Sequence, residues 1–192
     1  MPRSCRFLLC ATCAALGAIL LGATLGWAAV PKRHPVPREH PRLLGSRARL
    51  EDLARQRPEP YRRTVAVARQ RQGDDHAKML SMALVTAIER DADLGRRAVD
   101  MAMACVRGPI KKGHTPFAHD LARCAVVYDL CHEYWTESER AAFHRYVNAT
   151  VDANTQSETH VFHNGWYGYK WWGIGLACYA AYYENPRAPE IL

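Results

Sequence analysis

Apolar residues recur at helical spacing through most of the chain that follows its first 41 residues. The clearest run contains Phe117, Leu121, Cys124, Ala125, Tyr128, Cys131 and Trp135. These positions follow the i, i+4, i+7, i+8 pattern of one helix face, which predicts a helix with a buried side. No stretch of the sequence combines alternating β-branched residues with flanking hairpin turns, so the pattern predicts an all-α fold.

Local signals indicate where these helices begin and end. Ser46 is expected to cap the first helix, and the second is expected to cover roughly 60–71. Either Asp74 or Asp75 is the cap of the third helix, and Gly108 marks the end of the fourth. The residues expected to be buried in the third and fourth helices are Met79, Met82, Ala83, Leu84, Val99, Met103 and Val106.

The next pair of helices carries clearer boundary signals. Thr115 followed by Pro116 is a cap and first-turn proline, and Thr136 with Glu139 forms a capping box. The residues expected to face inward after that box are Phe143, Tyr146, Val147 and Val151. Helix, short turn and helix alternate, as in α/α toroids and α-solenoids. No TPR or HEAT consensus recurs, so we expect helical hairpins that form part of an incomplete α/α toroid.

The segment 162–183 is the most aromatic part of the chain. It holds three of the five tryptophans and five of the nine tyrosines, and Lys170 is its only formal charge. The sequence predicts a helix over about 166–184 that is apolar on every side, and we expect other helices to enclose it. The glycines expected to let neighbouring helices approach closely are Gly168, Gly173 and Gly175.

The N-terminus has the features of an export signal. Arg3 and Arg6 precede a long apolar run, and small residues offer a cleavage site near Ala28. The run is also long enough to span a bilayer, so an uncleaved membrane anchor is the alternative to a signal peptide over residues 1–28. In either case we expect a periplasmic or extracellular protein, with a proline-rich linker at 29–41 and the partial toroid at 42–192.

Composition and charge narrow the classes of partner. The chain is 48% hydrophobic and 23% charged, which excludes wholesale disorder. Its net charge of +7 favours an anionic partner, although charge alone does not separate nucleic acid, acidic polysaccharide and anionic lipid. The basic residues gather in the linker and the first two helices rather than beside the aromatic segment, so we expect no nucleic-acid partner.

Four cysteines follow the leader: Cys105, Cys124, Cys131 and Cys178. Cys124 and Cys131 are about 10 Å apart along one predicted helix, which is too far for a disulfide. All four lie among alanines and valines, so buried thiols are expected. These four cysteines form neither a CxxC motif nor a Cys/His framework, and the sequence implies no metal and no organic cofactor.

Three phrases occur in the order found in heparinase II/III-like and alginate lyase-like proteins. The first is HPRLLGSRARLEDLARQ at 40–56, the second is CAVVYDLCHEYWTESERAAFHRYV at 124–147, and the third is HNGWYGYKWWGIGLACYA at 163–180. They resemble, respectively, the family's opening phrase, its Tyr-Asp helix hairpin and its asparagine–tryptophan segment. The resemblance implies an α/α toroid followed by a β-sandwich region.

The resemblance also implies a polysaccharide lyase that cleaves uronic-acid polymers by β-elimination. Such an enzyme neutralises the uronate carboxylate, a base removes the C5 proton, and the 4-linked oxygen leaves. Asn164 matches the asparagine that contacts the carboxylate. Gly165 stands where the family often has histidine or a second asparagine, so His163 is the candidate substitute. The expected substrate-binding residues are Trp166, Tyr167 and Lys170.

Simpler roles compete with these assignments. Asn164 is a good helix cap, Lys170 can extend outward to solvent, and Asp129 of the Tyr-Asp pair is expected to be a structural hydrogen-bond acceptor. The family's catalytic tyrosine lies beyond the position that matches Leu192, so we expect a fragment. The alternative functions are a non-catalytic carbohydrate-binding or structural secreted protein and a toroidal glycoside hydrolase, although no carboxylate pair lies near Asn164.

Overall fold

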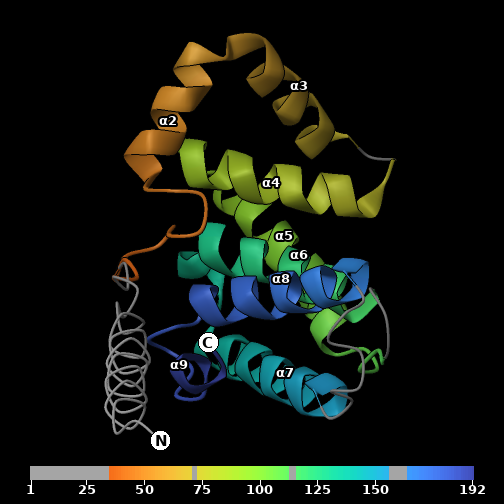
Figure 1. Cartoon of the computed structure of the whole chain (residues 1–192). Helices are drawn as coiled ribbons and strands as arrows, with labels where there is room; N and C mark the ends of the chain where they lie inside the picture. Colours follow the sequence, from red (N-terminus) through yellow and green to blue (C-terminus); the bar gives the residue numbers. More distant parts are fainter. Residues whose placement is uncertain (1–34, 71–72, 113–115, 156–163) are drawn as a thin grey trace, which may run out of the picture. The chain divides into compact units, whose positions relative to one another are not determined.

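The computed structural model describes residues 35–70, 73–112, 116–155 and 164–192, without the side chains of 155–171 (Figure 1). The expected leader at 1–28 and the expected cap Thr115 lie outside this part. From Val36 onward the described residues form one compact unit. They contain helices and no strand, which confirms the all-α fold.

The helices follow one another closely along the chain. They are α2 (Arg47–Gln56), α3 (Pro58–Arg69), α4 (Asp75–Glu89), α5 (Ala92–Val106), α6 (Pro116–Leu130), the short 3-10 helix η2 (His132–Tyr134), α7 (Glu137–Thr155), α8 (Asn164–Ala180) and α9 (Ala188–Ile191). Helix α4 packs against α2, α3, α5 and α6, and α6 packs most extensively against α8. Within the described part of the chain, no helix has the length and apolar character needed to cross a membrane.

The predicted caps begin the helices at or close to the expected residues. Ser46 Oγ accepts from the backbone N–H of Arg49 at 3.4 Å, which confirms it as the cap of α2. Asp74, rather than Asp75, caps α4, because its carboxylate accepts from the backbone N–H groups of His76 and Ala77 at 2.7 and 3.2 Å. Helix α3 begins at Pro58, two residues earlier than expected, because proline fits the first turn of a helix.

The capping box at the start of α7 is confirmed. The Thr136 backbone N–H donates to Glu139 Oε2 at 3.0 Å, and the Glu139 N–H donates to Thr136 Oγ1 at 3.3 Å. Arg96 of α5 donates to both carboxylate oxygens of Glu139, at 2.7 and 2.9 Å. This guanidinium lowers the pKa of Glu139 to about 2. The capping box therefore also holds the start of α7 against α5.

The hydrophobic core contains the residues that the helical pattern indicates. Every residue of the stripe from Phe117 to Trp135 is buried, and so are the four inward-facing residues expected in α7. The residues expected inside α4 and α5 are buried as well, except Leu84, which is only partly buried. This core places α6 at the centre of the packing, with α4, α5 and α8 around it.

Helix α8 begins at Asn164, two residues earlier than expected, and one of its faces is open to solvent. Trp172 and Tyr179 are each 46% exposed, whereas Ile174, Ala177 and Cys178 are buried. The expectation that other helices enclose this helix on every side is therefore wrong for its described side chains. Its main neighbour is α6, which covers its buried face, while Trp172 and Tyr179 remain partly in contact with solvent.

A single glycine controls how closely α6 and α8 approach. A Cβ atom at Gly173 would lie 2.4 Å from the backbone oxygen of Ala118, so only glycine fits at this crossing. At Gly175 a Cβ atom would meet nothing within 4 Å. The expected close approach is confirmed at Gly173 and wrong at Gly175, and the surroundings of Gly168 lie outside the described side chains.

Candidate functional site

The side chains of the expected substrate site lie outside the described part of the structure. His163 precedes α8, and Asn164 is the first residue of that helix. Trp166, Tyr167 and Lys170 follow in its first two turns. Their assignment to carboxylate binding, proton abstraction and sugar binding therefore stays a prediction.

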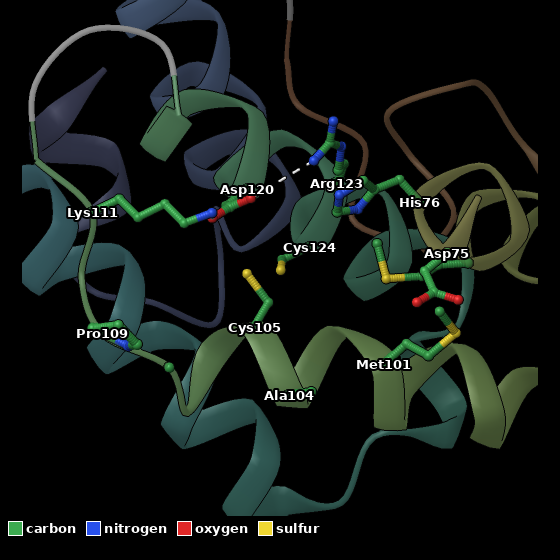
Figure 2. Close-up of a pocket in the computed structure, with 12 residues that line it drawn as sticks. Asp75, His76, Met101, Ala104, Cys105, Pro109, Lys111, Asp120, Arg123 and Cys124 are labelled. Carbon is green, nitrogen blue, oxygen red and sulfur yellow. Dashed lines mark ion pairs between the residues drawn. The ribbon is translucent and has the colours of Figure 1, made fainter.

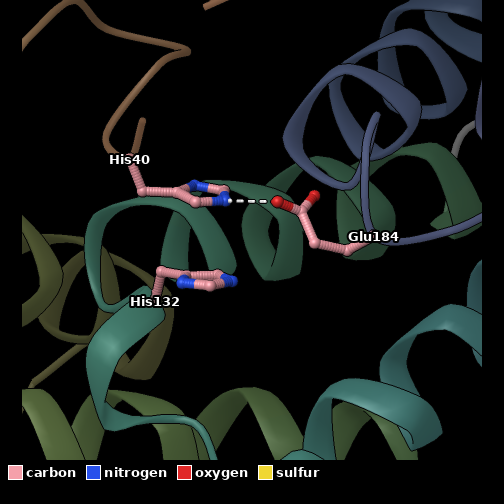
Figure 3. A group of neighbouring side chains, drawn as sticks. All are labelled: His40, His132 and Glu184. Carbon is pink, nitrogen blue, oxygen red and sulfur yellow. Dashed lines mark hydrogen bonds and ion pairs between the residues drawn. The ribbon is translucent and has the colours of Figure 1, made fainter. Parts of the chain in front are cut away.

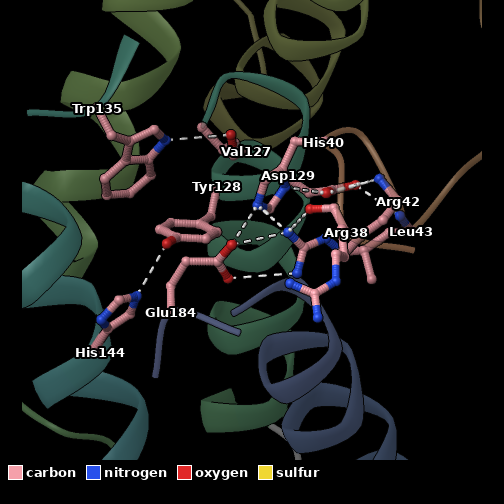
Figure 4. A network of polar contacts seen from close by, with 10 residues as sticks. All are labelled: Arg38, His40, Arg42, Leu43, Val127, Tyr128, Asp129, Trp135, His144 and Glu184. Carbon is pink, nitrogen blue, oxygen red and sulfur yellow. Dashed lines mark hydrogen bonds and ion pairs between the residues drawn. The ribbon is translucent and has the colours of Figure 1, made fainter. Parts of the chain in front are cut away.

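A buried polar network joins two of the three family-like phrases. The Asp129 carboxylate, whose side chain is 0% exposed, accepts from His40 Nδ1 at 2.6 Å, from the Arg42 backbone N–H at 2.9 Å and from the Leu43 N–H at 2.8 Å (Figure 4). These bonds fix the irregular HPRLL phrase against the end of α6. Asp129 is thus the structural hydrogen-bond acceptor that the sequence indicates.

Arg42 extends the network to the segment that follows α8. Its guanidinium, 1% exposed, donates from Nη2 to Glu184 Oε1 at 2.9 Å and to the Arg38 backbone oxygen at 2.9 Å (Figure 4). Tyr183 lies beside it, with its ring 5.5 Å from the Arg42 guanidinium and its hydroxyl donating to the Val36 oxygen at 2.7 Å. Residues 36–41, expected to be linker, are therefore anchored in the helical unit.

His40 stacks on a second imidazole. The rings of His40 and His132 lie 3.9 Å apart and are inclined by 8°. Arg42 Nη2 lies 2.7 Å from His40 Nε2, so Nε2 accepts and Nδ1 donates to Asp129 when His40 is neutral. The ring of the buried Tyr128 packs edge-on against both imidazoles. Its hydroxyl forms a hydrogen bond of 3.0 Å with His144 Nε2.

The pKa values of the two stacked histidines are shifted in opposite directions. Burial lowers the pKa of His40, but its hydrogen bonds to Asp129 and Glu184 outweigh burial and raise it. Burial and the neighbouring His40 lower the pKa of His132 to about 4, and its buried Nε2 has no hydrogen-bond partner among the described residues. Glu184 is also partly buried, which raises its pKa, yet its bonds to His40 and Arg42 dominate and bring it to about 2.

His40, His132 and Glu184 are the residues that could hold a metal ion. Within the described residues, their ligand atoms all lie within 4.8 Å of one another (Figure 3). The Arg42 guanidinium, however, lies 2.7 Å from His40 Nε2 and 2.9 Å from Glu184 Oε1. A positive charge among the donor atoms opposes a cation, so the arrangement fits an ion-pair network better than a metal centre.

One pocket adjoins this polar network, and a second lies elsewhere in the helical unit. One, of about 350 Å³, is lined by His40, Asp129, His132 and the exposed Glu133, and its walls are mainly polar residues. The other, of about 450 Å³, lies between α4, α5 and α6 and contains both Cys105 and Cys124 (Figure 2). The sequence did not indicate either pocket, because each is built from residues far apart along the chain.

No protein-family model, curated protein or solved structure matches the chain.

We predict that the stabilisation from His40 depends on pH. A raised pKa means that the stabilisation is complete below the ordinary value of 6.5 and disappears as pH rises through the folded value. The lowered pKa of Glu184 means that its contribution is present above 4.5 and disappears as pH falls through about 2. Replacing His40 by Gln should therefore lower the free energy of unfolding more at about pH 5.5 than at about pH 8.

Denaturant unfolding at the two pH values measures this difference. His76→Gln, at an exposed histidine near the start of α4, is the matched control and should leave the stability almost unchanged at both values. An equal loss for His40→Gln at both pH values would mean that the charge on His40 does not contribute to stability.

Proposed function

We propose that the chain is the helical N-terminal part of a polysaccharide lyase-like protein, exported from the cytoplasm, that acts on uronic-acid polymers by β-elimination. One observation carries this proposal. Asp129, of the Tyr-Asp phrase, holds the backbone of the HPRLL phrase, and Arg42 of that phrase bonds to Glu184, just beyond the asparagine–tryptophan helix. Phrases that stand in the family's order along the chain thus also make direct contact.

The packing of α8 gives the same proposal further support. This helix carries the third phrase, and its main contact is with α6, which carries the start of the second. The Gly173 crossing brings the two backbones together at Ala118, so α8 is held at a defined position relative to Asp129. We propose that these helix pairs belong to an α/α toroid, with the N-terminal end of α8 directed to the substrate cleft.

In this proposal Asn164 donates its side-chain amide to the uronate carboxylate. The N-terminal end of α8 contributes free backbone N–H groups and a positive dipole, both of which favour an anion. Neutralising the carboxylate makes the C5 proton more acidic, His163 removes that proton, and the 4-linked oxygen leaves as the double bond forms. Trp166 and Tyr167 pack on the sugar rings, and Lys170 pairs with a neighbouring carboxylate.

The protein should release an unsaturated product from an acidic polysaccharide. Incubation with alginate, heparin-type and chondroitin-type polymers, followed by ultraviolet absorbance, measures that product directly. The variant Asn164→Ala is made in an active protein that contains this chain. It should lower turnover by roughly 100-fold or more, as expected when a donor to a developing anion is removed. Its melting temperature should change little.

A second amide provides the matched control. Asn185 is 1% exposed and exchanges side-chain hydrogen bonds with Asn148 at 2.9 and 3.4 Å. Asn185→Ala should lower the melting temperature without a comparable loss of turnover in the folded protein. If Asn164→Ala instead lowers stability and turnover together, the residue is only a helix cap.

A non-catalytic carbohydrate-binding protein is the second candidate. Gly165 occupies the position of the usual base, and the exposed Trp172, with its ring 5.6 Å from that of His119, offers an indole face to solvent. Retained binding to an acidic polymer without any ultraviolet signal would favour this candidate. A toroidal glycoside hydrolase would instead release reducing ends without the unsaturated chromophore.

A further inference from the structure

Two cysteine side chains lie together in the pocket between α4, α5 and α6. Cys105 projects from α5 and is partly exposed, whereas Cys124 projects from α6 and is buried (Figure 2). Both residues line the same pocket of about 450 Å³. The pocket therefore gives a reagent access to Cys105, with Cys124 directly behind it.

The sulfur atoms of Cys105 and Cys124 lie next to each other in the pocket (Figure 2), close enough for each thiol to affect the acidity of the other. Cys124 Sγ is also 3.8 Å from the Ala102 backbone oxygen, and Cys105 Sγ is 4.0 Å from the Tyr146 hydroxyl. The Cys124 S–H can point to Ala102 while Cys105 is a thiol and turn to Cys105 when that residue is a thiolate. This arrangement stabilises a negative charge on Cys105.

The accessible Cys105 is the more acidic of the two thiols, as expected for the residue that attacks a disulfide as a thiolate. The neighbouring Cys124 thiol lowers the pKa of Cys105 and outweighs burial and the Asp120 carboxylate, which raise it, while Tyr146 and Lys111 add smaller lowering effects. The hydrogen bond to Cys105 and burial raise the pKa of Cys124 well above its usual range. Lys111 lines the same pocket and pairs with Asp120 at 2.6 Å, so the cation near the accessible sulfur is accompanied by a carboxylate.

We propose that Cys105 and Cys124 form a reversible disulfide that joins α5 to α6 inside this pocket. The oxidant is a low-molecular-weight or protein disulfide. The Cys105 thiolate attacks one sulfur of that disulfide, which breaks the S–S bond and releases one thiolate. The Cys124 thiolate then attacks the Cys105 sulfur and releases the second. Two protons pass from the cysteines to the two released thiols, and the oxidant is reduced by two electrons.

The remaining described cysteines lack these features. Burial raises the pKa of Cys131 to about 12 and that of Cys178 to about 11. Neither lines the pocket that contains Cys105 and Cys124. Oxidation should therefore select one pair, and this inference does not depend on the lyase-like function.

Peptide mapping of the full chain, equilibrated with reduced and oxidised glutathione, tests the proposal. Cleavage after arginine gives one peptide of residues 98–107, with Cys105, and another of residues 124–140, with Cys124 and Cys131. Under oxidising conditions we expect these peptides to be linked, with fragmentation placing the link at Cys124. The melting temperature should rise by about 5–10 °C because the crosslink restricts the unfolded chain.

Cys105→Ser should abolish both the link and the rise in melting temperature, and its partly exposed position makes it the safer variant for folding. Cys178→Ser is the matched control and should retain both. Three results would overturn the proposal: no link at the most oxidising ratio, a link that fragments to Cys131, or Cys105 that stops as a mixed disulfide with glutathione.

Discussion

Replacing Asp129 by Ala should lower the free energy of unfolding by about 3–5 kcal/mol, the largest effect that the structure predicts for one side chain. The Asp129 carboxylate is fully buried and accepts from His40 and from the backbone N–H groups of Arg42 and Leu43. Its removal leaves these donors buried without an acceptor and separates His40 from its charge partner. Denaturant unfolding of the variant and the wild type measures the loss.

An isosteric variant and an exposed carboxylate serve as controls. Asp129→Asn keeps the shape but presents an amide N–H₂ to backbone donors, so it should also destabilise strongly. Asp152, which pairs with Arg187 on the surface at 2.7 Å, should tolerate alanine with almost no change in the unfolding midpoint. A similar, small effect at both aspartates would contradict the assigned role of Asp129.

The second large effect is expected at the crossing of α6 and α8. Gly173→Ala places a methyl group 2.4 Å from the Ala118 oxygen and 2.6 Å from its Cα, both backbone atoms that cannot turn away. The helices must separate, which should cost about 2–3 kcal/mol of stability. Gly175→Ala in the same helix meets nothing within 4 Å and should instead raise stability by up to about 1 kcal/mol.

Denaturant unfolding of these two variants tests the crossing directly. Both add one methyl group to the same helix, but only the methyl group at position 173 meets the backbone of α6. If both alanines change stability in the same direction and by the same amount, α6 and α8 do not approach closely at Gly173.

Local features of the fold could be predicted from the sequence because their causes lie within a few residues. The caps at Ser46 and Asp74, the box of Thr136 and Glu139, and the buried stripe of α6 each depend on neighbouring side chains along one helix. The apolar character of α8 did not predict its surroundings. Which of its faces meets α6 is decided by residues of another helix.

The polar network and the thiol pair could not be predicted for the same physical reason. The bonds from His40 to Asp129 and from Arg42 to Glu184 span 89 and 142 residues of sequence. Cys105 and Cys124 lie on different helices. The separation of two cysteines along a single helix can be calculated from the sequence, but the distance between cysteines on two helices depends on how those helices pack. The HPRLL and Tyr-Asp phrases can be recognised in the sequence, but only the folded chain gives the contact between them.

The most direct test of the account is the hydrogen exchange of the Arg42 and Leu43 backbone amides, because the contact that carries the proposed function is their bond to Asp129. Both residues lie outside helices and strands, so an exchange rate near that of an unprotected peptide would be their default. Because Asp129 accepts from both N–H groups, we expect both amides to exchange as slowly as amides of the buried core of α6. Fast exchange at both positions in the native protein would contradict it.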